Sequence, residues 1–191
     1  MPFQYTNRRG KTYCLHEGQT KSGSRKFYFA QKAEGDLVEK IPDGYEIHEN
    51  PNGQVSLRKI QPKIITDSEK ALGDKYLQRL ARNTRYMADV KGKVITIFES
   101  VQDVDLLEEL FENISGSRPV DNKAILQQIT SFMPVMRFIL EEEAERKFRV
   151  ERYCFLGSID DWMDLGDSGR LEILVKKYVK HLGKDSLFEL M

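Results

Sequence analysis

The chain has 191 residues, and its 30 basic and 30 acidic side chains give a formal net charge of zero. Hydrophobic residues make up 40% of it and charged residues 31%, which predicts a folded core and excludes wholesale disorder. A global excess of basic residues would be the simplest argument for a nucleic-acid or membrane partner, and this chain has none. No stretch approaches the roughly 18 apolar residues of a membrane span, and the first residues lack a signal-peptide core. The two cysteines, Cys14 and Cys154, are too few for a disulfide framework, so we expect a reduced, cytoplasmic protein without a membrane partner.

The zero net charge conceals a basic and aromatic N-terminus. Residues 1–33 contain seven basic side chains, six aromatic residues and a single acid, Glu17. The balance becomes acidic further along the chain, most clearly at residues 141–143 and 160–167. An uneven charge distribution is a better indication of a binding surface than the total charge.

Residues 1–61 are predicted to form a small antiparallel β-meander. The turn sequence Asn-Pro-Asn-Gly at 50–53 closes the second of two hairpins. Because side chains alternate along a strand, Phe27 and Phe29 should lie on one face and Tyr28 on the other. The predicted strands cover residues 11–17, 25–31, 45–49 and 54–60.

Residues 62–191 are predicted to form a mixed body of helices and hairpins. Thr66 and Glu69 have the spacing of a capping box at the start of the first helix. The last helix is the most regular, with Leu174 and Tyr178 on its apolar face and a cap at Asp167 or Ser168. The predicted helices cover about 67–82, 101–113, 122–133 and 169–182, and the predicted hairpins cover 85–99 and 135–156.

The segment 135–156 supports two interpretations. The run of acids and bases at 141–147 has strong helix propensity. The residues on both sides alternate, however, and 148–155 is rich in β-branched and aromatic residues, which favours a hairpin turning at 143–146. We favour the hairpin. The chain is therefore predicted to be an α+β protein in which a β-meander (1–61) precedes a mixed α/β body (62–191) with about four helices and two further hairpins. Whether the two parts pack as one domain is left open.

The acidic segment 160–167 is predicted to lie in a loop. Carboxylates suit Mg²⁺ or Ca²⁺, but this spacing does not fit a calcium-binding loop, and Trp162 lies where a ligand would be needed. Cys14 and His16 share a strand face and could meet His48, but a zinc site would need a fourth ligand. No metal site and no cofactor are predicted.

The chain contains no nucleophile elbow, no phosphate-binding glycine loop and no zinc-ligand pair, so no catalytic residue is assigned. A small cation-dependent phosphodiesterase or nuclease is one alternative function, with acids at 141–145 or 160–167 converging on a phosphate. Another alternative is a protein–protein adaptor that docks through the apolar residues 187–191.

The basic N-terminal sheet is the preferred candidate for a binding site. Cations can contact phosphates while exposed rings stack on bases, and the loop 21–26 resembles DNA-binding hairpin arms by architectural analogy. The alternative is that Phe27 and Phe29 form a core and the lysines only protect an edge strand. The predicted partner is nucleic acid or an acidic protein, and the oligomeric state is left open. The candidate residues are Arg8, Arg9, Lys21, Arg25, Lys26, Tyr28 and Lys32.

Overall fold

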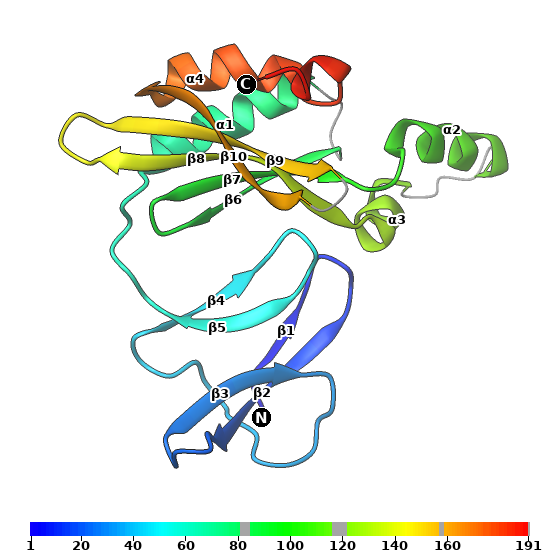
Figure 1. The fold of residues 1–191 in the computed structure, drawn as a ribbon. Helices are drawn as coiled ribbons and strands as arrows, with labels where there is room; N and C mark the ends of the chain where they lie inside the picture. Colours follow the sequence, from blue (N-terminus) through cyan, green and yellow to red (C-terminus); the bar gives the residue numbers. More distant parts are fainter. Residues whose placement is uncertain (81–84, 116–121, 157–158, 191) are drawn as a thin grey trace. The chain divides into compact units, whose positions relative to one another are not determined.

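The computed structural model describes residues 1–80, 85–115, 122–156 and 159–190. Within these ranges the chain forms ten strands, arranged in three antiparallel sheets, and four α-helices (Figure 1). The chain divides into two compact units. The first comprises Met1–Gln61 with Ser117–Thr130, and the second comprises Pro62–Gly116 with Ser131–Met191.

The first unit contains a three-stranded sheet, a hairpin and one helix. Its elements are β1 (Gln4–Thr6), β2 (Thr12–Gln19), β3 (Arg25–Ala30), β4 (Tyr45–Glu49), β5 (Val55–Lys59) and α3 (Asn122–Ile129). The sheet has the order β1-β2-β3, and β4 pairs only with β5. Gly53 closes the β4–β5 turn with a φ of +71°, a conformation that glycine adopts without strain. The two hairpins predicted from the sequence are confirmed, but they lie in separate sheets and do not form the continuous meander that was predicted.

Side chains from both sheets form the interior of the first unit. The ring of Phe27 packs edge-on against Tyr45, with centroids 5.8 Å apart. Tyr5 donates a hydrogen bond of 2.8 Å to Glu49 Oε2, and Leu15 is fully buried. Strand register places Tyr5, Leu15 and Phe27 on one face of the three-stranded sheet, so this face turns toward β4 and β5.

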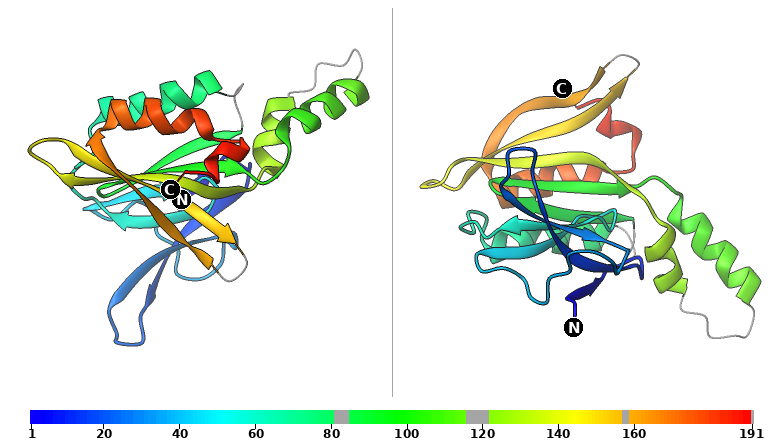
Figure 2. Two further views of the ribbon diagram at one scale, coloured as in Figure 1. Left: turned by 45° about the horizontal axis from the view of Figure 1, so that its top comes forward. Right: turned by 90° about the horizontal axis from the view of Figure 1, so that it is seen from below.

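The second unit is built on a five-stranded antiparallel sheet of order β10-β9-β8-β7-β6. Its elements are α1 (Asp67–Leu80), β6 (Tyr86–Lys91), β7 (Val94–Ser100), α2 (Val104–Ser115), β8 (Phe132–Glu142), β9 (Lys147–Leu156), β10 (Ile159–Arg170), α4 (Leu171–Tyr178) and two short 3-10 helices, Val179–His181 and Asp185–Leu187. Figures 1 and 2 show α1 and α4 side by side on one face of this sheet. Alternate strand residues on that face form the main core with α1 and α4. This core includes Ile95, Ile97, Met136, Phe138, Phe148, Val150, Leu77, Leu174 and Tyr178.

The predicted fold class is wrong in its balance of elements. The described residues are mostly β, and the described part of the second unit has three α-helices (α1, α2 and α4) where about four were expected. The segments 85–99 and 135–156 do form strands, but they are not separate hairpins. Ile97 of β7 lies opposite Met136 of β8, so both segments belong to one sheet. Residues 101–131 separate these two strands, and no local pattern specifies such a distant pairing. The broader α+β description agrees with the structure.

Three local predictions in the second unit also need correction. Residues 160–167 lie in the edge strand β10 and not in a loop, with a register irregularity between Asp164 and Ser168. The helix predicted over 122–133 ends earlier: α3 ends at Ile129, and Phe132 already begins β8. Asp121, the expected N-cap of the same predicted helix, lies outside the described residues. The helix α4 begins at Leu171 after Arg170, without a side-chain cap, because Asp167 is bonded to Lys177 and Tyr178 instead.

Other predictions for this unit are confirmed. Residues 135–156 form the β8–β9 hairpin, which turns at 143–146. Leu174 and Tyr178 are buried at 1% and 4% exposure. None of the helices in the described ranges is long and apolar enough to cross a membrane.

Candidate functional site

The three-stranded sheet of the first unit has two chemically different faces. One face carries the aromatic interior described above. The other, which we call the Tyr28 face, carries the alternate residues of the same strands. None of these residues is acidic. They are Gln4, Thr6, Thr12, Cys14, His16, Gly18, Lys26, Tyr28 and Ala30.

The ring of Tyr28 is held flat against β2 and is still partly open to solvent. It stacks on the imidazole of His16, with centroids 5.2 Å apart and planes inclined by 13°. A Cβ atom at Gly18 would lie 3.2 Å from Tyr28 Cε1, so the glycine makes room for the ring. Tyr28 nevertheless keeps 43% of its surface exposed. This is the geometry of an aromatic platform.

His16 is a fixed support for this platform. It is 4% exposed, and its Nε2 lies 2.9 Å from the carbonyl oxygen of Lys32. Because a carbonyl can only accept, Nε2 carries the hydrogen. On its other side, His16 pairs with Leu37 in an isolated antiparallel bridge. The bridge fixes the backbone of His16, and the burial and the bond to Lys32 hold its imidazole beside the Tyr28 ring.

Three of the predicted cations gather at the end of the β2–β3 hairpin, and all three are exposed. Lys21 lies in the turn, and Lys26 lies on the Tyr28 face opposite Gly18. Arg25 lies on the opposite face, where its Nε is 3.2 Å from Glu17 Oε1. The structure thus brings Lys26 and Tyr28 together on one face, with Lys21 beyond them and Arg25 turned away.

The remaining predicted residues divide between two places. Lys32 follows β3 with an exposed side chain, and its carbonyl accepts the His16 bond, so it belongs to the Tyr28 neighbourhood. Arg8 and Arg9 lie in the β1–β2 turn, at the other end of β2 and roughly 25 Å away along the strand. Arg9 Nη2 donates a 2.7 Å bond to the carbonyl of Thr130. Burial and the neighbouring Arg9 lower the pKa of Arg8 despite the attraction of Glu49. These two arginines stabilise the first unit and do not join the Tyr28 cluster.

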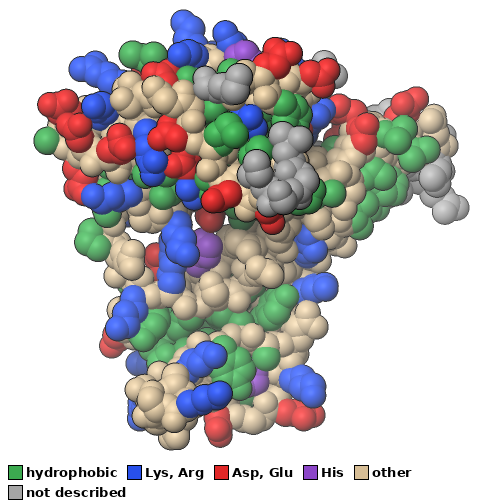
Figure 3. Space-filling view, in the orientation of Figure 1, with side chains coloured by type: hydrophobic (Ala, Val, Ile, Leu, Met, Phe, Trp, Pro, Cys, Tyr) green, Lys and Arg blue, Asp and Glu red, His purple; other side chains and the backbone are tan. Residues whose placement is uncertain are grey.

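The charge around the Tyr28 face is modestly positive. Residues 1–61 contain ten basic and seven acidic side chains. In Figure 3, basic side chains outnumber acidic ones over the β1–β5 part of the chain, whereas both signs intermingle over the second unit. The nearest acidic segment runs beside β2, where the Asp36 carbonyl accepts from Glu17 N at 2.9 Å. A polyanion would therefore meet a local cationic end and not a uniformly basic unit.

Sequence reasoning missed the roles of His16 and Gly18. The i, i+2 spacing of Cys14 and His16 did place these two on one strand face, but the predicted strand ended at Glu17 and left out Gly18, which lies within β2. A glycine inside a strand is also a recognised sign of close approach by another group. The cross-strand pairing of His16 with Tyr28 was the missing information, because it depends on the register of the hairpin.

The acids of the alternative nuclease hypothesis do not converge in the described structure. Among residues 141–143, each carboxylate pairs with a different cation: Glu141 with Arg149 at 3.3 Å, Glu142 with Lys147 at 3.3 Å and Glu143 with Lys93 at 2.8 Å. In β10, Asp164 pairs with Arg149 at 3.3 Å and Asp167 with Lys177 at 2.7 Å. The described residues contain no group of three His, Cys, Asp or Glu side chains that could hold a metal ion.

The apolar segment at 187–191 is partly used inside the second unit. Leu187 is 5% exposed in the core, and Leu190 packs against the same core. The carbonyl of Leu190 accepts a 3.0 Å bond from Arg152. Phe188 is 61% exposed, and Met191 lies outside the described residues. Within the described part of this segment, Leu187 and Leu190 are thus used in the core, whereas Phe188 stays exposed.

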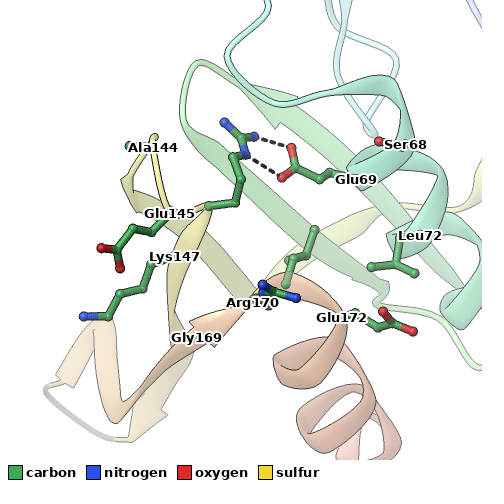
Figure 4. A pocket seen from close by; sticks show the side chains of 11 residues that line it. Ser68, Glu69, Leu72, Ala144, Glu145, Lys147, Gly169, Arg170 and Glu172 are labelled. Atoms are coloured by element: carbon green, nitrogen blue, oxygen red, sulfur yellow. Dashed lines mark hydrogen bonds and ion pairs between the residues drawn. The ribbon is translucent and has the colours of Figure 1, made fainter.

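The second unit contains an open pocket of about 860 Å³ (Figure 4). It lies where α1 and α4 begin and where the β8–β9 turn approaches them. Glu69 and Arg146 form a bidentate pair on one side, while Glu145 and Lys147 point away from this pair. The lining residues are Ser68, Glu69, Leu72, Ala144, Glu145, Arg146, Lys147, Gly169, Arg170, Leu171 and Glu172. The charges of Glu69 and Arg146 thus neutralise each other, and we call this ion pair, which joins α1 to the β8–β9 turn, the clasp.

The clasp is built on the predicted capping box, which is confirmed. Thr66 N donates to Glu69 Oε2 at 2.8 Å, and Glu69 N donates to Thr66 Oγ1 at 3.2 Å. Arg146 Nε donates to Glu69 Oε1 at 2.9 Å and Arg146 Nη2 to the Ile64 carbonyl at 3.1 Å. Arg146 occupies the left-handed region with φ of +53°, which is uncommon for a non-glycine residue.

This clasp should make stability depend on pH. Burial alone would raise the pKa of Glu69, but hydrogen bonds from Arg146 and Thr66 outweigh it and lower the pKa. A depressed pKa in the folded state stabilises above the unfolded pKa, near 4.3, and this contribution disappears as pH falls through the folded pKa. Glu69→Gln should therefore unfold at lower urea concentration than the wild type at pH 7, and the gap should close below about pH 4. Glu172→Gln, an exposed carboxylate of the same pocket, serves as the control. A gap that persists unchanged at pH 3 would contradict the prediction.

Comparison with known proteins supplies no analogy for either feature. No protein-family model, curated protein or solved structure matches this chain. The functional argument therefore depends on the chain's own residues. The Tyr28 face combines an exposed ring with exposed cations, whereas in the pocket of the second unit Glu69 and Arg146 are paired with each other.

Proposed function

We propose that the protein is a cytoplasmic, non-enzymatic binding protein whose first unit contacts nucleic acid through the end of the β2–β3 hairpin. The observation that carries this proposal is the supported and exposed Tyr28 ring beside Lys26 on a face without acidic residues. Lys21 and Lys32 add exposed cations close by. The cytoplasmic location fits two cysteines that are buried and unpaired.

The chemistry of the hairpin end suits a polyanion with flat bases. Lysine and arginine neutralise phosphates and release condensed counterions, which supplies affinity without sequence preference. The aromatic ring supplies a second kind of contact, because every base has a π face. An acidic protein could use the cations but would gain little from the ring. The combination therefore favours nucleic acid over an acidic protein partner.

Affinity should fall with salt, but less steeply than for a site that used all six predicted cations. With Arg8 and Arg9 at the far end of β2, about two to four cations remain to contact phosphates, so we expect a log–log slope of about −2 to −3. Lys21→Gln combined with Lys26→Gln should reduce the slope by about 1.5 without unfolding the protein, because both side chains are exposed. The measurement is fluorescence anisotropy of a labelled 12-mer between about 20 and 200 mM salt.

The matched control removes the same charge from the second unit. Lys176→Gln combined with Lys180→Gln changes two exposed lysines of the C-terminal helical segment and should leave the slope unchanged. Equal losses in both double variants would mean that only the overall charge matters. Absence of wild-type binding to DNA and RNA at about 20 mM salt would refute the proposed function, since electrostatic attraction is strongest there.

A further inference from the structure

We infer that the Tyr28 face is a base-stacking site that selects single-stranded nucleic acid over duplex. The inference rests on the proposed function and adds the class of ligand. Bases in a duplex are already stacked and turned inward, so a protein ring can reach them only in an unpaired strand. Phosphates, by contrast, are accessible in both forms. A site with cations alone would not prefer single strands.

The Tyr28 ring is preorganised for stacking by its contacts within the protein. His16 covers one side of the ring at 5.2 Å, and the ring edge lies over Gly18. Tyr28 is 43% exposed. The His16 ring that supports it is held in turn by a hydrogen bond to the Lys32 carbonyl. A ring that is held in place loses little conformational entropy when a base stacks on it. A surface tyrosine without such support would lose more.

The cations lie at the right distance to hold the backbone of a stacked nucleotide. Lys26 and Tyr28 are alternate residues of β3, so their Cβ atoms project from the same face roughly 7 Å apart. The lysine stem is long enough to cover that distance. Lys21 in the turn extends the cationic path beyond Lys26. One stacked base with one or two neighbouring phosphates is therefore the smallest ligand that the site fits.

Gly18 and His16 are positioning residues for this site. A methyl group at position 18 would lie 3.2 Å from Tyr28 Cε1, so Gly18→Ala should shift the ring by a few tenths of an ångström while leaving the cations in place. Strand propensity favours alanine over glycine slightly, so the sheet itself should tolerate the change. A purely structural role would affect all ligands equally, whereas loss of the platform should affect only ligands with bases.

The experiment compares three 12-mer probes: single-stranded oligo(dT) and an abasic strand, which carry equal numbers of phosphates, and a duplex, which carries twice as many. Wild type should bind oligo(dT) more tightly than the abasic strand. Tyr28→Ala should weaken oligo(dT) binding by roughly 5- to 150-fold and leave the abasic and duplex probes unchanged. Tyr28→Phe and Tyr28→Trp should restore oligo(dT) binding, because they keep the ring. Gly18→Ala should weaken only the oligo(dT) complex, and Thr12→Ala, at the far end of the same face, should have no effect.

The possible outcomes separate this inference from the proposed function. Failure of every probe to bind at low salt would refute both. Binding of all probes with equal affinity, or oligo(dT) binding that is insensitive to Tyr28→Ala, would overturn the stacking site and leave a purely electrostatic interface. Circular dichroism of each variant establishes that the sheet is intact, and the Phe and Trp variants keep the test valid if Tyr28→Ala unfolds the hairpin.

Discussion

Leu174→Ala should lower the free energy of unfolding of the second unit by about 2–5 kcal/mol. Leu174 is 1% exposed in α4 and packs in the core between the sheet and the helices. Truncation removes buried methyl groups and leaves a cavity that the surrounding strands can fill only in part. The single tryptophan of the chain, Trp162, lies in β10 of the same unit. Its fluorescence in a urea titration therefore reports the unfolding of this unit specifically.

The neighbouring residue of the same helix provides the control. Ile173 is 62% exposed, so Ile173→Ala removes a similar side chain from the surface and should change stability by about 0.5 kcal/mol or less. Equal effects of the two substitutions would mean that α4 does not contribute its apolar face to the core. A change in the steepness of the transition would instead indicate that the substitution alters the surface exposed on unfolding or breaks two-state behaviour.

Local patterns in the sequence were sufficient to predict individual elements. Helical spacing located α1 and α4, and the Asn-Pro-Asn-Gly turn located the β4–β5 hairpin. The capping box of Thr66 and Glu69 forms as predicted. In each case the signal depends on residues within a few positions of one another, where backbone preferences and side-chain bonds act directly.

The remaining errors come from contacts between distant residues. The pairing of β7 with β8 joins segments on either side of 101–131, and nothing within either segment specifies it. The strand β10 has few apolar residues, because it is an edge strand stabilised by ion pairs such as Asp164 with Arg149. Polar edge strands resemble loops in composition, which explains the incorrect loop prediction.

Only part of the candidate site could be predicted, because its arrangement also depends on contacts between distant residues. Strand alternation correctly separated Tyr28 from Phe27. The same rule puts Arg25 and Lys26 on opposite faces, although proximity in sequence had grouped them. Arg8 and Arg9 were grouped with the others by composition, yet β2 separates them from the hairpin end. Composition locates a basic region, but only register determines which cations share a face.

The second large effect should come from the face of the five-stranded sheet opposite α1 and α4. Glu151 of β9 is buried there with 6% of its side chain exposed, between two arginines. Arg149 Nη1 lies 2.8 Å from Glu151 Oε1, and Arg137 Nε donates to Oε2. Arg137 also lies over the Trp162 ring, 4.2 Å from its centroid. One carboxylate thus holds two cations and, through Arg137, the edge strand β10.

Glu151→Leu should destabilise the second unit by about 2–4 kcal/mol, because it removes the carboxylate paired with Arg137 and leaves Arg149 to Glu141 and Asp164. The loss should fall short of the full cost of an isolated buried charge, since Arg137 and Arg149 are 28% and 34% exposed and can regain some hydration. The native-state fluorescence of Trp162 should also shift, because the hydrogen bond to Glu151 no longer holds Arg137 over the indole ring.

The double variant Arg137→Leu with Glu151→Leu distinguishes the cost of an unpaired charge from the cost of losing the ion pair itself. Removing both charges replaces an ion pair with apolar surface, which is often neutral, so the double variant should be more stable than Glu151→Leu alone. Asp67→Asn, which breaks the exposed pair with Lys63, should cost only a small fraction of the Glu151 effect. Additive losses in the double variant would show that Glu151 acts through packing alone. A native-state fluorescence maximum unchanged in Glu151→Leu would show that Arg137 is held over Trp162 by the ring itself.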